Sequence, residues 1–155
     1  FAGHRAQVMA VPGHTTGHIA YYFADSDALF CGDTLFALGC GRVFEGTMDQ
    51  MWRSLSALRA LPDDTRVYCA HEYTQANARF ALSVDGDNPA LVQRAAKIDS
   101  LRAAGRPTVP SALGEEKRTN PFLRADDPAL AAAVGLAAAD PVAGFAEVRG
   151  LKDRF

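Results

Sequence analysis

The sequence predicts an α+β protein in which a strand-rich portion, residues 1–72, precedes a helical portion, residues 73–155. Two observations predict this division. Short apolar runs that end at turn residues fill the first portion, and such runs are typical of β-strands. In the second portion, Asn-Pro and Asp-Pro pairs place a capping side chain before a proline, which is typical of the first residues of a helix.

Four strands are expected in the first portion, at residues 8–11, 19–24, 28–31 and 66–70. One helix lies between the third and fourth strands. It begins after Thr47, because Thr47 and Gln50 have the spacing of a capping box. Apolar residues then follow at helical spacing until a proline ends the pattern, namely Met51, Leu55, Leu58, Leu61 and Pro62.

Helix starts are expected in the second portion at Asn88, Asp127 and Asp140, each of which precedes a proline. An apolar stripe of helical spacing follows Asn88 and is closed by a glycine, with Leu91, Ala95, Ile98, Leu101 and Gly105 as its members. Residues 106–124 contain three prolines and are predicted to form a long ordered loop.

The composition is that of a globular protein, with 48% hydrophobic and 22% charged residues. The net charge of −2 argues against a nucleic-acid partner, and no apolar run is long enough for a membrane span. Three cysteines without a Cys-x-x-Cys pair argue against a disulfide framework, so a reducing, cytoplasmic location is expected. The chain starts with neither Met nor a signal peptide, and we expect it to be part of a longer protein.

Three of the expected strands lead into a side chain that can bind a metal ion. The first leads into His14, the third into Asp33 and the fourth into His71. Imidazole and carboxylate together suit zinc, iron or manganese, and a carboxylate can bridge two ions. Each residue alone would more often be structural, as a turn cap, a helix cap or a core histidine, and it is the coincidence at three strand ends that favours metal binding. His18 is interpreted as structural, because the preceding Gly17 and the following strand argue against a helical His pair.

Several segments together resemble one known family. They are residues 12–18 (Pro-Gly-His-Thr-Thr-Gly-His), 30–36 (Phe-Cys-Gly-Asp-Thr-Leu-Phe), 39–47 (Gly-Cys-Gly-Arg-Val-Phe-Glu-Gly-Thr) and 67–73 (Val-Tyr-Cys-Ala-His-Glu-Tyr). Later segments with the same resemblance are 107–111, 120–122 and 149–153. The family is hydroxyacylglutathione hydrolase (glyoxalase II) of the metallo-β-lactamase superfamily.

The resemblance implies the C-terminal half of an αββα sandwich followed by a small helical domain. Residues 1–72 would be a partial metallo-β-lactamase domain, and residues 73–155 a helical, glutathione-binding domain. The family's Thr-His-x-His-x-Asp-His motif, which supplies further metal ligands, is absent from this sequence. We therefore expect the missing N-terminal part of the same protein as a partner, an apolar sheet face that this chain leaves uncovered, and no activity from this chain alone.

The resemblance also implies the site residues and the cofactors. His14 and His71 would each bind one of two divalent metal ions, zinc above all, although iron or manganese would also fit. Asp33 would bridge the two ions and serve as the catalytic residue. The substrate-binding residues implied for the glutathione thioester are Arg42, Phe44, Tyr73, Arg149 and Lys152.

The implied reaction is hydrolysis of S-D-lactoylglutathione to glutathione and the 2-hydroxy acid D-lactate, as part of methylglyoxal detoxification. The enzyme is expected to be a monomer. Two alternatives stay open. One is a glutathione persulfide dioxygenase with a single iron, and the other is a non-catalytic fragment that binds a glutathione conjugate.

Overall fold

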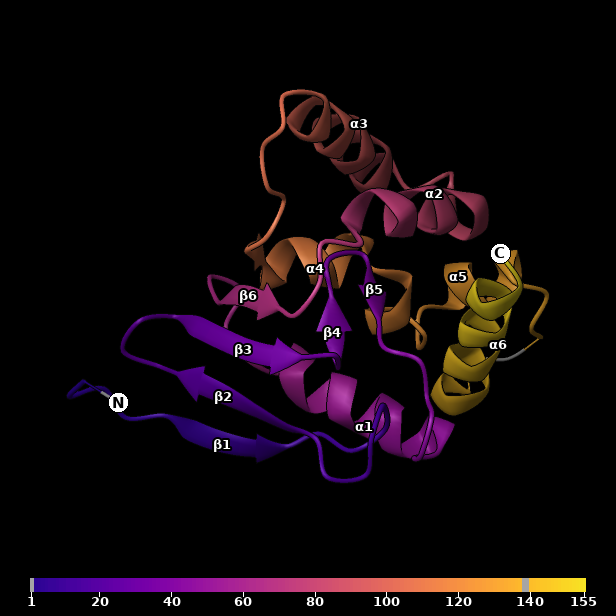
Figure 1. The fold of residues 1–155 in the computed structure, drawn as a ribbon. Coiled ribbons are helices and arrows are strands. Elements are labelled where there is room, and N and C mark those ends of the chain that lie inside the picture. The colour runs from indigo at the N-terminus through magenta and orange to yellow at the C-terminus, as the bar shows by residue number, and fades with distance from the viewer. Residues whose placement is uncertain (1, 138–139) are drawn as a thin grey trace.

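The computed structural model describes residues 2–137 and 140–155. Its main sheet has the strand order β1-β2-β3-β6-β7. These strands are β1 (Gln7–Ala10), β2 (Ile19–Phe23), β3 (Ala28–Gly32), β6 (Arg66–Cys69) and β7 (Ser111–Ala112). β3 pairs with β6 in parallel, and every other neighbouring pair is antiparallel. Consequently β1, β3 and β6 run in the same direction and end at the same edge of the sheet (Figure 1).

The elements that connect β3 to β6 are a small hairpin and a helix. The hairpin consists of β4 (Leu35–Phe36) and β5 (Gly39–Cys40), and the helix is α1 (Met48–Arg59). The prediction of α1 is confirmed. Its predicted capping box is also present, because the side chains of Thr47 and Gln50 each accept a hydrogen bond from the other's backbone N–H. The four strands predicted in the first portion are also confirmed, within two residues at each end.

The main sheet has one buried and one exposed face. Directly paired residues on neighbouring strands share a face, and the outer row consists of the exposed Val8, Tyr21 and Phe30 and the half-buried Tyr68. The next row lies on the opposite face and is buried, and its members are Tyr22, Leu29, Val67 and Ser111. Phe30 is 44% exposed and stacks on Tyr68, with ring centroids 4.8 Å apart. The expected uncovered apolar face is therefore present.

Two neighbouring residues of β3 should respond very differently to truncation in the 155-residue chain. Phe30→Ser should change the free energy of unfolding by less than about 1 kcal/mol, because this ring faces solvent. Leu29→Ala should cost about 2–5 kcal/mol, because Leu29 is fully buried. Denaturant titration measures both. A loss at Phe30 as large as at Leu29 would show that the outer row is covered in solution.

The helical portion contains α2 (Thr74–Asp85), α3 (Pro89–Ala103), α4 (Leu113–Thr119), the 3₁₀ helix η1 (Pro121–Leu123), α5 (Pro128–Ala133) and α6 (Pro141–Arg154). Asn88, Asp127 and Asp140 cap helices as predicted, each accepting backbone N–H bonds at the start of its helix. Figure 1 shows these helices gathered at the end of the molecule away from β1.

The prediction of a loop over residues 106–124 is wrong from residue 111 onward. This segment contributes β7, α4 and η1. α4 is only seven residues long and buries Glu116 on its inner side, so it has no apolar stripe for sequence periodicity to detect. Its stability comes from tertiary contacts.

One hydrophobic core joins the two portions of the chain. Leu29 and Leu55 belong to the same cluster of buried side chains as Phe80, Phe122 and Phe145. Within the described residues, no helix combines the length and the apolar character that crossing a membrane requires. All three cysteines, Cys31, Cys40 and Cys69, are free.

Candidate metal and substrate site

The shared direction of β1, β3 and β6 brings the three predicted metal ligands together. Each follows the end of one of these strands, and Asp33 lies between the two histidines. His71 Nε2 is 3.1 Å from Asp33 Oδ1, and His14 Nε2 is 3.9 Å from Asp33 Oδ2. Each carboxylate oxygen therefore faces a different imidazole, which is the arrangement that a bridging ligand needs.

The hydrogen bonding of His14 fits a metal ligand. Its Nδ1 lies 2.8 Å from the backbone carbonyl oxygen of Arg42, and a carbonyl can only accept, so Nδ1 carries the proton. Nε2 of a neutral imidazole is then a bare acceptor, and it faces a carboxylate oxygen that is also an acceptor. A cation between these two atoms satisfies both. A ring nitrogen fixed by a backbone carbonyl is also the usual support of a ligating histidine.

His18 holds the backbone of Asp33 through a hydrogen bond. The backbone N–H of Asp33 donates to His18 Nε2 over 3.1 Å, so this nitrogen is engaged in holding the backbone. Gly32 is needed for this approach, because it has a φ of +53° and a Cβ there would lie 2.6 Å from His18 Nε2. His18 therefore has the structural role predicted for it.

A cavity of about 430 Å³ collects most of the predicted site residues, and its lining is His14, Asp33, Phe36, Arg42, Phe44, His71 and Tyr73. Tyr73 stacks on His71 with ring centroids 4.8 Å apart, and Phe44 lies 5.1 Å from His14. Phe36 contacts both His71 and Tyr73. Sequence reasoning gave Phe36 no role, since nothing in its spacing places it beside residue 71.

The two remaining predicted residues, Arg149 and Lys152, lie on α6 and do not line this cavity. Arg149 is 3% exposed and donates to the Cys40 carbonyl and to Asp153. The same Asp153 oxygen lies 3.4 Å from Arg42 Nε, so this carboxylate links Arg149 to the wall of the cavity.

Lys152 lies on the same helix as Arg149, one turn further along the chain. Its ammonium lies over the rings of Phe80 and Phe155, 5.1 and 5.3 Å from their centroids. Burial, with Arg149, Arg79 and Arg42 nearby, lowers the pKa of Lys152. An excess of positive charge of this kind favours an anionic group beside it.

The described residues do not by themselves form a metal site. The three candidate ligands meet in pairs through Asp33, and no three or more His, Cys, Asp or Glu side chains of residues 2–137 and 140–155 are arranged to hold an ion. Cys40 is not a competing nucleophile, because burial raises the pKa of its thiol to about 11.

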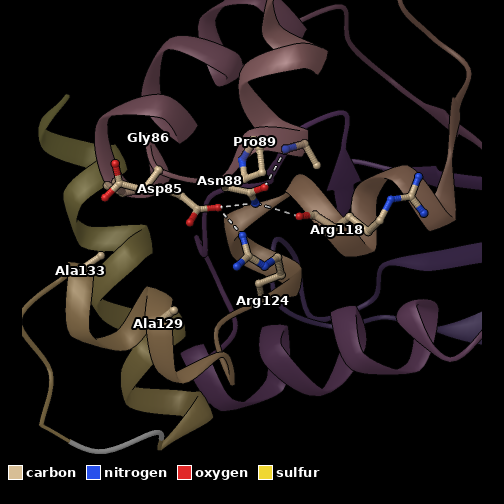
Figure 2. Close-up of a pocket in the computed structure, with 11 residues that line it drawn as sticks. Asp85, Gly86, Asn88, Pro89, Arg118, Arg124, Ala129 and Ala133 are labelled. Atoms are coloured by element: carbon tan, nitrogen blue, oxygen red, sulfur yellow. Dashed lines mark hydrogen bonds and ion pairs between the residues drawn. The ribbon is translucent and has the colours of Figure 1, made fainter.

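A larger cavity, of about 550 Å³, lies elsewhere, beside the turn that joins α2 to α3 (Figure 2). Three of its polar side chains, Asp85, Asn88 and Arg124, have partners within the protein. Arg124 pairs with Asp85, and Asn88 donates both to Asp85 and to the Arg118 carbonyl. These contacts brace the α2–α3 turn against the segment after α4.

The sheet, with two histidines and a carboxylate at its strand ends, indicates a class of protein that comparison with known families confirms. Residues 1–71 match the family described as the metallo-beta-lactamase superfamily, and this membership implies binding of divalent metal ions. Residues 72–155, more than half of the chain, match the family described as hydroxyacylglutathione hydrolase C-terminus. The chain belongs to the hydroxyacylglutathione hydrolase family.

Curated relatives carry the same name over the whole chain. A hydroxyacylglutathione hydrolase from Synechococcus sp. (strain JA-2-3B'a(2-13)) is 65% identical over 155 residues, which are 100% of this chain and 61% of the relative. That from Rhodopseudomonas palustris (strain BisA53) is 61% identical over 149 residues, 96% of this chain and 58% of the relative. The chain thus spans about three fifths of the length of these relatives.

Solved structures share the fold at lower identity. ETHE1 from Myxococcus xanthus has a TM-score of 0.57 and 27% identity over 94% of this chain and 44% of its own. A metallo-beta-lactamase from Staphylococcus aureus subsp. aureus COL has a TM-score of 0.52 and 21% identity over 95% of this chain and 38% of its own. The second likeness concerns the fold alone.

Proposed function

We propose that the full-length protein hydrolyses S-D-lactoylglutathione, or a similar 2-hydroxyacylglutathione, to glutathione and the hydroxy acid. In the cell this reaction would serve methylglyoxal detoxification. The observation that carries the proposal is the cavity in which Asp33 stands between two histidines while Arg42, Phe44 and Tyr73 line the walls. The name shared by the relatives supports the substrate class.

His14, Asp33 and His71 would hold two divalent metal ions, with Asp33 shared between them. The chemistry that such ions supply is activation of a water molecule and polarisation of the thioester carbonyl. The protein's own contribution is orientation. The Arg42 carbonyl fixes the ring of His14, and His18 fixes the backbone of Asp33. We propose zinc as the resident metal, and iron or manganese would suit the same ligands.

The substrate side of the cavity would be formed by Arg42, Phe44 and Tyr73. Phe44 is 68% exposed and has no hydroxyl, so it supplies shape and apolar contact only. The leaving group is a thiol of pKa near 8.5, and its departure as a thiolate needs no dedicated proton donor. The site therefore has to bind and orient the thioester, and the exposed aromatic rings of Phe44 and Tyr73 can do so.

We propose Arg149 and Lys152 as the cations that hold the glycine carboxylate of glutathione. Their position supports this role indirectly, since Asp153 connects Arg149 to Arg42 at the cavity wall. The proposed domain boundary lies between residues 72 and 73. We further propose a cytoplasmic monomer whose missing N-terminal part supplies the other ligands and covers the exposed face of the sheet.

Substitution of the two cations tests the proposed substrate. In the full-length protein, Arg149→Ala and Lys152→Ala should each raise KM for S-D-lactoylglutathione about 10-fold to 100-fold with little change in kcat, because a charge-assisted contact to carboxylate is worth roughly 1.5–3 kcal/mol. For a simple thioester without the glutathione carboxylates, both substitutions should leave KM and kcat unchanged. Steady-state kinetics on the two substrates provide the measurement.

Equal losses on both substrates would assign Arg149 to the fold alone, consistent with its bonds to Cys40 and Asp153. Lys152→Ala is the cleaner variant, because within the described part of the chain the Lys152 ammonium donates one hydrogen bond, to the Ala76 carbonyl at 3.4 Å, beside its contacts with the Phe80 and Phe155 rings. Oxygen consumption by the same protein, with one bound iron, would favour the dioxygenase instead.

A further inference from the structure

A fully buried carboxylate lies at the junction between the hairpin and the helical portion. Glu116 on α4 has no exposed surface and pairs with Arg94 of α3, whose side chain is 4% exposed. Its Oε2 accepts from the backbone N–H of Leu38 at 2.9 Å and from Asn120 Nδ2 at 3.1 Å. Both carboxylate oxygens are therefore occupied by donors, and none of these donors is solvent.

The hairpin that Glu116 holds has an unusual turn. Leu38, at the turn between β4 and β5, has a φ of +56°, a conformation that residues with a side chain rarely adopt. A turn of this kind persists only where its surroundings over-determine it. The carboxylate of Glu116 supplies the bond that satisfies the Leu38 N–H in this position.

Two asparagines from the helical portion complete the support. Asn77 of α2 donates to the Ala37 carbonyl at 3.1 Å. Asn120 donates to the carbonyls of Phe36 and Gly39, both at 3.1 Å. The polar backbone groups around the turn are thus bonded by side chains that lie about 40 to 80 residues later in the chain.

The supported hairpin leads directly into the candidate site. Phe36 on β4 contacts the rings of His71 and Tyr73, at centroid distances of 6.0 and 5.5 Å. β5 continues into Arg42, which lines the cavity and whose carbonyl fixes the His14 ring. A shift of the turn would therefore move one wall of the cavity.

We propose that Glu116 is a positioning residue for substrate binding, acting through the Leu38 turn on Phe36 and Arg42. The kinetic form of this proposal rests on the proposed thioester hydrolysis. Glutamine is the informative substitution, since it keeps the size of Glu116 and replaces one acceptor oxygen by an amide donor. The new amide N–H would face either Arg94 or the pair Leu38 and Asn120. All three are hydrogen-bond donors, so at least one of their bonds to residue 116 would be lost.

In the full-length protein, Glu116→Gln should raise KM for S-D-lactoylglutathione about 10-fold and change kcat less than about 3-fold, with bound metal unchanged. A general loss of folded protein would instead lower kcat and leave KM as it was. Glu115→Gln is the matched control. Glu115 is the neighbouring carboxylate, lies 3.4 Å from the same Arg94, and has no bond to the hairpin. It should leave KM unchanged.

Two further measurements distinguish the positioning role from misfolding of Glu116→Gln. One uses a second variant, and the other needs no substrate. Asn77→Ala removes one hairpin bond and no charge, and it should raise KM about 3-fold. Amide hydrogen exchange at Leu38 should accelerate at least about 10-fold in Glu116→Gln and stay unchanged in Glu115→Gln, while exchange at Leu55 in α1 is unaffected.

Unchanged KM in both Glu116→Gln and Asn77→Ala, or unchanged exchange at Leu38, would overturn the positioning role. If the unsubstituted protein does not hydrolyse the thioester, the proposed function fails. The exchange measurement would then still decide whether Glu116 holds the turn.

Discussion

Asp33→Ala in the full-length protein should remove tight binding of at least one metal ion and lower kcat/KM at least about 1000-fold. The two carboxylate oxygens of Asp33 face His14 and His71 separately, so no other described side chain can take over the bridge. Loss of a supporting residue around a metal typically costs 10–100-fold, and loss of a shared ligand should cost more. Metal analysis of the purified variant, together with steady-state kinetics, measures both effects.

Tyr73→Phe is the control for this experiment. Its ring stacks on His71 and stays in place, and the substitution removes only a phenol hydroxyl on a half-exposed side chain. Loss of one hydrogen bond predicts a decrease in kcat/KM of no more than about 10-fold, with metal content unchanged. Two tightly held ions in Asp33→Ala would contradict the bridging role.

The parts of the fold that the sequence predicted are those with local signals. Strands β1, β2, β3 and β6 are short apolar runs that stop at turn residues, and α1 has a complete capping box. The β4–β5 hairpin escaped detection because each of its strands has two residues, too few for a periodic pattern. α4 escaped because its inner face carries Glu116, whose partners lie on other elements.

The site shows the same division. The proximity of His14, Asp33 and His71 could be predicted because each lies in the loop that follows a strand, and strands that run in the same direction end at the same sheet edge. Phe36 and Glu116 could not be predicted, since their contacts join residues 35 to 78 positions apart. The placement of Arg149 was equally hidden. Helical spacing places Arg149 on one face with Lys152. Arg149 is buried, however, and its hydrogen bond to the Cys40 carbonyl joins residues that lie 109 positions apart in the sequence.

The 155-residue chain should be nearly inactive as a separate polypeptide. Two metal sites of four or more ligands each cannot be filled by His14, Asp33 and His71. The curated relatives are longer, with this chain matching about three fifths of their length, so they have room for further ligands.

The test is an assay of the purified 155-residue polypeptide with S-D-lactoylglutathione and excess zinc, beside the full-length protein. Turnover of about 10 per second, the median for enzymes, would contradict this expectation. It would mean that His14, Asp33 and His71 suffice, without ligands from the rest of the protein, for the metal binding that hydrolysis requires.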